Sequence, residues 1–237
     1  MISNKDIFGK ALWDYHNDSY TEDITVHSSL TEDDAMPIPY LFRDFDEMPA
    51  IEQKALTLSQ GKTLDIGCCA GSHSLWLQEK GINVTGLDIS EGAVMLSRKR
   101  GLHTTIHRHI LHHITKYDTL LLLMNGTGIF ETIDKIDIYL QHLKSLLNPG
   151  GQILIDGSDI KYMFEDEDGS YWVDLHKAYY GEVEMAMSYK QYTSEPFNWL
   201  YLDFETLALH AKKNELNCEL ILEGTHHEYL ARLTSAV

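Results

Sequence analysis

The sequence contains few cysteines, few prolines and no long apolar run. Of its 237 residues, three are cysteine and five are proline. Cys68 and Cys69 are adjacent and the number of cysteines is odd, which is a poor arrangement for structural disulfides, so we expect a reducing compartment. The longest apolar run, Leu120 to Met124, is far too short to cross a bilayer, and the first eighteen residues lack a signal-peptide core. These absences predict a soluble, cytoplasmic protein with no membrane partner.

Basic residues are also scarce. Nineteen lysines and arginines stand against 36 acids, which gives a net charge of −17 and a pI near 5.0. Such a surface repels a phosphate backbone, so we expect no nucleic-acid partner and favour a small-molecule one. The densest basic run, Arg98 to Arg100, falls near an expected helix end, where cations suit the helix dipole. The oligomeric state is left open by these numbers.

The residues that could bind a metal are not spaced as in a metal site. Histidines 103, 107, 109, 112 and 113 fall within eleven residues, but no cysteine or carboxylate lies nearby at ligand spacing. The adjacent cysteines 68 and 69 are not a Cys-x-x-Cys redox motif. We therefore expect no metal.

One stretch, residues 63–90, organises the chain. Residues 63–66 are a short apolar run interrupted by Asp65, typical of a buried parallel strand, and Gly67 and Gly71 bracket the turn that follows. Glycine permits backbone conformations closed to other residues and lets a ligand approach the main chain. A helix and a second strand follow, and Asp88 at the end of that strand is placed to accept hydrogen bonds from ribose hydroxyls. The stretch predicts a site for an adenosine-containing ligand.

Helices and strands go on alternating after this unit. Residues 91–100 predict a helix, 104–110 a third strand, 117–124 a fourth, 134–147 a helix and 152–155 a fifth strand. Five strands that alternate with helices predict an α/β fold with a parallel, doubly wound sheet.

The flanking segments complete a single domain, 1–237. Residues 1–60 look helical and irregular, with no recurring strand pattern, and predict an N-terminal helical cap or lid before the cofactor-binding half, 61–156. In 157–202, a period of two places Val183, Met185, Met187 and Tyr189 on one face of a strand, so this insertion predicts an antiparallel ribbon that covers the substrate. Residues 203–237 predict a closing helix and a β-hairpin.

The motifs together resemble the class I S-adenosylmethionine-dependent methyltransferases over about residues 45–237. LDIGCCAGSHS resembles the family's glycine turn, GLDIS its acidic second-strand end, YDTLLLLMN its fourth strand and LLNPGGQILID its turn into the fifth strand. The resemblance implies a Rossmann-like seven-stranded sheet with an antiparallel last strand and helices on both faces. It also implies S-adenosyl-L-methionine as cofactor and methyl transfer as the activity.

The same resemblance implies which residues bind the cofactor. Asp88 would hold the ribose hydroxyls, Ile89 would pack against adenine, and Met124 and Asn125 would form the bottom of the site. The whole set comprises Asp65, Gly67, Cys68, Cys69, Ala70, Gly71, Asp88, Ile89, His109, Ile110, Leu111, Met124 and Asn125. The Asn-Gly pair at 125–126 resembles the fourth motif of methyltransferases that modify a nitrogen or oxygen atom of a small molecule.

The chain departs from the family pattern at two positions. Cys69 stands where the family usually has a glycine, and His109 stands where it usually has an acid. A cysteine at position 69 requires a backbone conformation that a residue with a Cβ can adopt. A histidine at position 109 can accept from the adenine amino group only through an unprotonated ring nitrogen.

Acceptor contacts are expected from the flanking segments, which are rich in aromatic residues. Such rings are suited to a sulfonium or a cationic amine, although most of them are expected to be packing residues. The candidates are Tyr15, Tyr20, Tyr40, Arg43, Trp172, Tyr179 and Trp199. The catalytic residue is left unassigned because methyl transfer from a sulfonium needs positioning above all; by region, the available bases are His176, Glu182, Glu184, Asp156 and Asp159.

Two alternatives stay open at this point. A nicotinamide-dependent oxidoreductase also uses a glycine turn and an acid at position 88, but a dinucleotide turn needs a third glycine, and the chain has Cys69 and Ser72 at the relevant positions. A non-catalytic module that keeps the fold and binds the cofactor is the other alternative.

Overall fold

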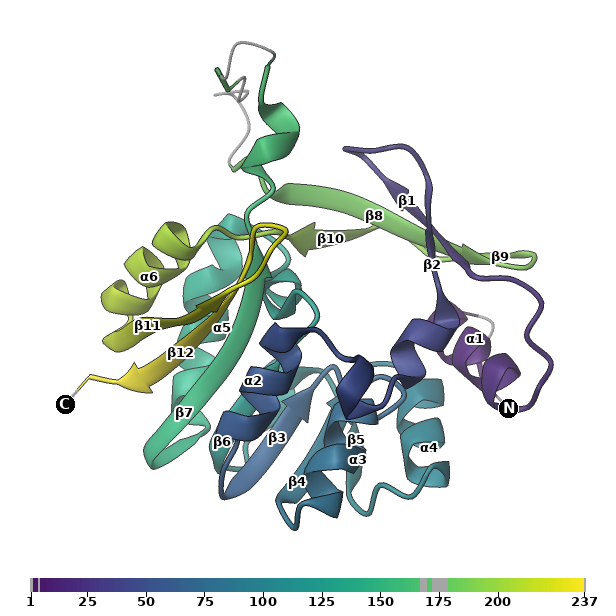
Figure 1. Ribbon diagram of the computed structural model, residues 1–237, viewed down its shortest axis with the longest axis horizontal. Helices are drawn as coiled ribbons and strands as arrows, with labels where there is room; N and C mark the ends of the chain where they lie inside the picture. The colour runs from purple at the N-terminus through teal and green to yellow at the C-terminus, as the bar shows by residue number, and fades with distance from the viewer. Residues whose placement is uncertain (1, 4, 167–169, 172–178, 237) are drawn as a thin grey trace.

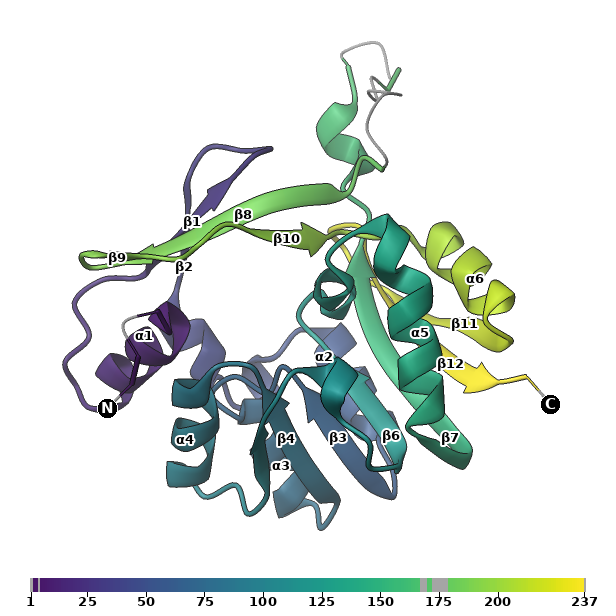
Figure 2. The same cartoon turned by 180° about the vertical axis from the view of Figure 1, so that it is seen from behind.

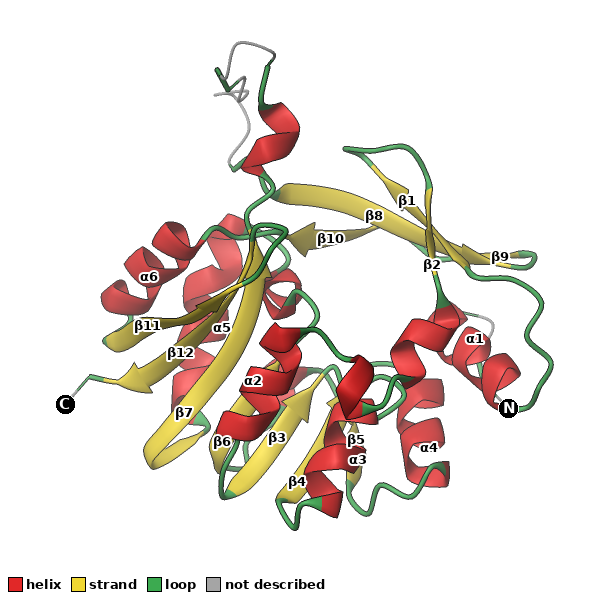
Figure 3. Ribbon diagram, in the orientation of Figure 1, coloured by secondary structure: helices red, strands yellow, loops and turns green. Residues whose placement is uncertain are grey.

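The structure is a computed structural model that describes residues 2–3, 5–166, 170–171 and 179–236. Two sheets carry the fold, a seven-stranded one and a smaller five-stranded one that lies across its upper edge in the view of Figures 1 and 3. Trp172 and His176 lie outside the described residues. No helix in the described ranges is long and apolar enough to cross a membrane.

The large sheet has the topology that the sequence predicts. Its strands in spatial order are β11 (Leu216–Glu223), β12 (Glu228–Ser235), β7 (Leu147–Ser158), β6 (Tyr117–Leu122), β3 (Lys62–Ile66), β4 (Asn83–Asp88) and β5 (Thr105–His107). The five strands from β7 to β5 are parallel, and β12 is antiparallel to both of its neighbours. The chain steps from β3 out to β5 and returns to β6 on the other side of β3. Such a reversal of strand order opens a ligand crevice at the carboxyl ends of the strands.

Helices cover both faces of this sheet. In Figure 1, α2 (Ala50–Leu58) and α3 (Ser72–Glu79) lie in front of the strands, and Figure 2 shows α5 (Ile136–Ser145) and α6 (Phe204–Lys213) on the opposite face. The helix α4 (Glu91–Lys99) packs beside β4 and β5. Along β6, Leu120 and Leu122 belong to the core under α5, whereas Leu121 belongs to the core under α2 and α3. A strand buried on both faces in this way has to be continuously apolar.

The small sheet joins segments that are far apart in the sequence. Its order is β10 (Phe197–Leu200), β8 (Glu182–Tyr189), β1 (Ile24–Ser28) and β2 (Asp34–Met36), and β9 (Tyr192–Thr193) also pairs with β8. The pairing of β8 with β10 confirms the expected antiparallel ribbon, with Val183 opposite Trp199. The expectation that residues 1–60 form no strand was wrong, because β1 finds its main partner in β8, and His27 and Ser188 are 161 residues apart along the chain.

The remaining elements of residues 1–60 connect the two sheets. They are α1 (Ile7–His16) and the 3-10 turns η1 (Ile38–Phe42) and η2 (Phe45–Glu47). The helix α1 packs closely on α4. A Cβ added at Gly92 would lie only 2.7 Å from the Cα of Gly9, so the two backbones can approach this closely only with glycine at these positions. Further 3-10 turns are η3 (Ile110–His112), η4 (Gly126–Phe130), η5 (Ile133–Lys135) and η6 (Lys161–Phe164).

Several strand boundaries differ from those expected. β5 ends at His107 and β6 at Leu122, so His109 and Met124 lie in the loops that follow these strands. β7 begins at Leu147, before Gln152, because the Asn-Pro-Gly-Gly segment is already part of the extended strand. The shorter β5 and β6 place more of the candidate site on loops at the carboxyl edge.

Candidate functional site

The glycine turn after β3 is fixed by backbone hydrogen bonds. The amides of Gly67 and Cys68 both donate to the carbonyl of Leu87 on β4, at 2.8 and 3.1 Å. Gly67, Cys69 and Gly71 have φ angles of +79°, +52° and +87°. The turn therefore uses the left-handed region three times within five residues, which glycine adopts freely and cysteine at some cost. A Cβ at Gly67 would meet only Ile129 Cδ1, at 3.6 Å, so the main chain here is open to a ligand.

Asp88 ends β4 beside this turn. Its carboxylate accepts from the amides of Cys69 at 2.9 Å and Ser90 at 2.8 Å, and the residue is 8% exposed. Burial raises the pKa of Asp88 to about 6, although both amide hydrogen bonds oppose the shift. Next to it, Ile89 is an isoleucine with 68% of its surface exposed. An acid and an exposed apolar side chain at one strand end suit a ribose and an adenine ring.

Asp65, near the end of β3, is buried in the fold. Ser74 Oγ on α3 donates to its carboxylate at 2.6 Å, and the residue is 2% exposed. Burial raises the pKa of Asp65. The contact ties the first turn of α3 to β3, so Asp65 acts on the glycine turn through this helix.

The loop after β6 has a second constrained turn. Met124 and Asn125 have φ angles of +65° and +59°. Asp156, on β7, accepts from the amides of Met124 at 3.0 Å and Gly126 at 2.6 Å. Burial raises the pKa of Asp156 to about 6, against the effect of these backbone donors. Sequence reasoning named Asp156 only as an available base; its position at the end of a buried strand was the signal for this backbone role.

His109 does not present its acceptor nitrogen freely. Its Nδ1 accepts from the amide of Leu111 at 3.2 Å, as the N-cap of η3. Burial lowers the pKa of His109, so the neutral ring is favoured. The carbonyl of Ile110 is also engaged, with His142 Nε2 at 2.8 Å. The expected histidine contact to an adenine amino group would have to replace the contact to Leu111.

Two further side chains stabilise these turns and were not predicted from the sequence. Arg100 Nη1 donates to the carbonyl of Ala70 at 2.7 Å and so holds the glycine turn from α4. Asp6 accepts from Ser90 Oγ and from the amide of Gly92, both at 2.8 Å, and ties α1 to the turn that carries Asp88. No local sequence pattern distinguishes Asp6. Its role becomes evident only from the packing of α1 on α4.

The aromatic candidates fall into two groups. Tyr15 and Tyr20 pack edge to face, with ring centroids 5.4 Å apart, in the same apolar cluster as Cys69 and Met124. The hydrogen bond to Asp23 raises the pKa of Tyr20 to about 12, with a smaller effect of desolvation.

The other candidates lie elsewhere. Tyr179 donates to Asp203 at the start of α6 and packs on the core of the large sheet, away from Tyr15 and Tyr20. Trp199 lies against Gly128, where an added Cβ would come within 2.0 Å of its Cε2. The structure therefore brings Tyr15 and Tyr20 to the turn residues, and Tyr179 to a different part of the fold.

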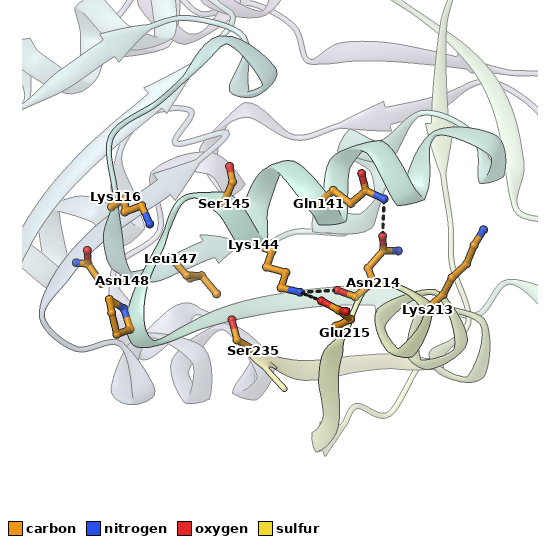
Figure 4. Close-up of a pocket in the computed structure, with 11 residues that line it drawn as sticks. Lys116, Gln141, Lys144, Ser145, Leu147, Asn148, Lys213, Asn214, Glu215 and Ser235 are labelled. Carbon is orange, nitrogen blue, oxygen red and sulfur yellow. Dashed lines mark hydrogen bonds and ion pairs between the residues drawn. The ribbon is translucent and has the colours of Figure 1, made fainter. Parts of the chain in front are cut away.

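A surface hollow lies at the opposite end of the sheet. It is formed by the end of α5, the start of β7 and the end of α6, and Figure 4 shows Lys144 in it, bound to Glu215 and to the carbonyl of Asn214. Because Leu147 begins β7 and Asp156 lies near its end, this hollow is remote from the glycine turn. Within the described residues, no group of three or more His, Cys, Asp or Glu side chains is placed to hold a metal ion.

Comparison with known proteins agrees with this geometry. A family model described as a methyltransferase domain matches residues 40–204. A methyltransferase from Bacteroides fragilis, solved in complex with S-adenosyl-L-homocysteine, is 39% identical, with a TM-score of 0.94 over 100% of this chain and 98% of that one. No curated protein sequence matches the chain.

More distant structures share the fold. The CcbJ methyltransferase from Streptomyces caelestis has a TM-score of 0.61 at 14% identity over 81% of this chain and 95% of that one. The sugar N-methyltransferase KedS8 from Streptoalloteichus has a TM-score of 0.56 at 11% identity over 83% and 88%.

The fold and the turn at its carboxyl edge define a class I S-adenosylmethionine-dependent enzyme. The chain belongs to the methyltransferase family, and its cofactor is S-adenosylmethionine. This membership confirms the resemblance seen in the four sequence motifs and excludes the nicotinamide-dependent alternative as its class.

Proposed function

We propose that the chain methylates a nitrogen or oxygen atom of a small molecule that binds between the glycine turn and the small sheet. The observation that carries this proposal is one apolar cluster that joins both sides. Cys69 and Met124 from the cofactor side pack in it together with Met187 of β8 and Val26 of β1, all only partly buried. Partly buried apolar side chains of this kind suit an acceptor with an apolar body.

The cofactor is placed along the carboxyl edge of the large sheet in this proposal. Asp88 accepts from the ribose hydroxyls, Ile89 packs on the adenine, and the open main chain at Gly67 and Gly71 faces the rest of the molecule. Bound there, the cofactor supplies a methyl group on a sulfonium, which is already an activated leaving group. What the chain adds is the alignment of the acceptor atom behind that methyl and the exclusion of water.

The flanking segments form the cover. Residues 1–60 and 157–202 contribute the paired strands β1 and β8, residues 61–156 hold the cofactor, and 203–237 close the large sheet. This division supports the cap role because the cover is anchored to the cofactor side at both ends. Trp199 rests on Gly128 after β6, and Asp6 binds the turn after β4.

Three of the four acids named as candidate bases in the described residues are engaged in other contacts. Asp156 accepts from two loop amides, Asp159 accepts from Tyr180 at 2.7 Å, and Glu182 accepts from the amide of Ile133 at 2.7 Å. Glu184 lies on the exposed face of β8. This arrangement supports transfer governed by positioning, to an acceptor atom that reacts unprotonated or passes its proton to water.

The test is transfer of a labelled methyl group from S-adenosylmethionine to a panel of amines, phenols and carboxylates, with nucleic acid and protein as additional acceptors. We expect label in a small molecule. The Asp88→Asn variant is the matched negative control, because it keeps the side-chain shape and removes the charge. Label found only in nucleic acid or protein contradicts the proposal, and cofactor binding without transfer to any acceptor supports the non-catalytic alternative.

A further inference from the structure

A serine, a histidine and an aspartate are linked by side-chain contacts on the small sheet. Ser188 lies on β8, His27 on β1, and Asp33 in the loop between β1 and β2. Oγ of Ser188 contacts Nε2 of His27, and Nδ1 of the same ring lies 2.9 Å from Oδ2 of Asp33. We call these three residues the Ser188 cluster. None of them takes part in the proposed methyl transfer.

The register of the strands brings the serine and the histidine together. In the antiparallel pairing of β1 with β8, Thr25 is opposite Ser188 and His27 is opposite Ala186. His27 and Ser188 are therefore diagonal neighbours on one face of the sheet. Diagonal neighbours are about 7–8 Å apart, a separation that an aromatic ring can span. The contact is thus set by the backbone of two paired strands.

The Ser188 cluster lies on the outer face of the small sheet. Val26 and Met187, the neighbours of the cluster residues along β1 and β8, pack in the apolar cluster that also contains Cys69 of the glycine turn. Successive side chains of a strand point to opposite faces, so the Ser188 cluster faces away from the glycine turn. The side chains of His27 and Asp33 are 36% and 61% exposed, and a reagent can reach them from solvent.

The contacts have the order that activates a serine hydroxyl. The carboxylate of Asp33 accepts the N–H of Nδ1, so the neutral ring of His27 turns the lone pair of Nε2 toward Ser188. This nitrogen can take the hydroxyl proton when Oγ attacks a carbonyl carbon. Serine hydrolases of unrelated folds activate their nucleophile with the same sequence of contacts.

Two threonines flank the nucleophile on its own face. Thr25 of β1 is directly opposite Ser188 on one side, and Thr193 of β9 is directly opposite it on the other. Directly opposite side chains have Cβ atoms about 4.5–5.5 Å apart. Their hydroxyl groups are donors within reach of the oxygen of a carbonyl group held at Ser188, where negative charge develops during attack.

The charge around the cluster limits the substrate. Glu32, Asp33 and Asp34 are consecutive in the sequence, and the chain as a whole carries a net charge of −17. Such a surface repels anions. An uncharged ester can approach it without this penalty.

We propose that the Ser188 cluster hydrolyses uncharged carboxylic esters. Oγ of Ser188 bonds to the carbonyl carbon and its proton passes to Nε2 of His27. The bond from that carbon to the alcohol oxygen then breaks, and the alcohol leaves with the proton. Water next attacks the acyl group on Ser188, again giving a proton to His27, and the carboxylic acid leaves as the proton returns to Oγ. Asp33 is a positioning residue that holds the ring.

Two reagents test this activity on the whole chain. A fluorophosphonate probe loses fluoride to a base-activated serine and leaves a phosphonyl group on Oγ, which mass spectrometry of peptides locates. We expect that group on Ser188. p-Nitrophenyl acetate measures turnover, which should be lost in Ser188→Ala. Both reactions should be about 100-fold slower in His27→Ala, because general-base catalysis contributes about 10²–10⁴-fold.

Two further variants sharpen the test. Ser145→Ala removes an exposed serine whose hydroxyl donates to the carbonyl of His142 at 2.6 Å, so both rates should stay at the wild-type values. Asp33→Asn should slow both reactions by less than His27→Ala, because the ring remains present. In every variant, calorimetry should give an S-adenosyl-L-homocysteine affinity within about twofold of the wild type, since the cluster lies on the outer face.

The proposal is overturned by any of three results. The first is the absence of a phosphonyl group on Ser188 in the wild-type protein, a result that depends on no variant and on no change in folding. The second is labelling at the wild-type rate in His27→Ala, which would mean that no base activates the serine. The third is ester hydrolysis that persists in Ser188→Ala.

Discussion

The cofactor half of the large sheet and the small sheet above it are built in opposite ways. From β3 to β5, each element packs against one that is close in the sequence, and the key geometry is in the backbone: three positive φ angles, strand ends and amide donors. The small sheet pairs β1 with β8 across most of the chain, and its inward face is defined by side chains. In the proposed function, the first region binds the cofactor and the second contacts the acceptor.

This difference implies that the two regions can be disturbed separately. A change at the strand ends of the large sheet should alter cofactor affinity. A change where the small sheet is anchored should alter turnover and stability and leave cofactor affinity largely intact. The following predictions test that separation, beginning with the largest expected effect.

Removing the acid at the end of β4 should have the largest effect. Asp88→Ala eliminates the acceptor for two ribose hydroxyls, and hydrogen bonds to a charged group contribute about 1.5–3 kcal/mol each, so the S-adenosyl-L-homocysteine affinity should fall by at least about 100-fold. Isothermal titration calorimetry measures it. Asp134→Ala, at an exposed acid of η5, is the control and should bind normally. Unchanged affinity in Asp88→Ala would show that the ribose lies elsewhere.

Disturbing the contact between Gly128 and Trp199, which anchors the small sheet, should lower the free energy of unfolding. In Gly128→Ala the new Cβ would lie 2.0 Å from Trp199 Cε2, and overpacking of this kind costs about 1–3 kcal/mol of the free energy of unfolding. Methyl transfer should fall with it, while cofactor affinity stays within about twofold. Urea unfolding and calorimetry measure both. Adding Trp199→Ala should cost less than the sum of the single changes, and simple additivity would argue against this contact.

Cofactor affinity should depend on pH through the acid of β4. The pKa of Asp88 is raised to about 6, so the carboxylate is ionised above that value and gains a proton below it. Ribose hydroxyls donate to the ionised form, and the affinity should therefore be constant above pH 7 and about tenfold lower at pH 5. Asp88→Asn should bind weakly with a flatter pH profile. A wild-type profile that is flat from pH 5 to 8 would contradict this role.

The smallest effect is expected at the unusual residue of the glycine turn. Cys69→Gly relieves a left-handed conformation but makes the unfolded chain more flexible, so the free energy of unfolding should change by less than about 1 kcal/mol. Cofactor affinity should be kept or slightly improved. Urea unfolding and calorimetry check both, and a large loss of affinity would mean that the Cys69 side chain itself contacts the ligand.

Sequence reasoning was most successful where structure is local. Gly67, Gly71 and Asp88 form one contiguous motif, so their spacing alone predicted the turn and the strand end. β1 could not be found because its five residues lack a nearby partner of comparable length, and β2 has only three. The pairing with β8 is a long-range event that no local pattern encodes.

The buried contacts among Arg43, Glu52 and His73 also could not be predicted from local sequence patterns. Arg43 and Glu52 are nine residues apart, and His73 follows after another helix boundary, so their meeting depends on how α2 and α3 pack. The sequence named Arg43 as a candidate contact to the acceptor. In the structure its guanidinium is buried and hydrogen-bonded to Glu52.

The position of β1 in the middle of the small sheet has a consequence for synthesis on the ribosome. β1 leaves the ribosome early, but its partner β8 is made about 160 residues later, as the separation of His27 and Ser188 shows. At about 5–20 residues per second, the early strand waits on the order of ten to thirty seconds. During that time the large sheet can begin to form from β3 onward, with the N-terminal strand still unpaired. The small sheet therefore cannot be completed until β8 (Glu182–Tyr189) and β10 (Phe197–Leu200) have been made.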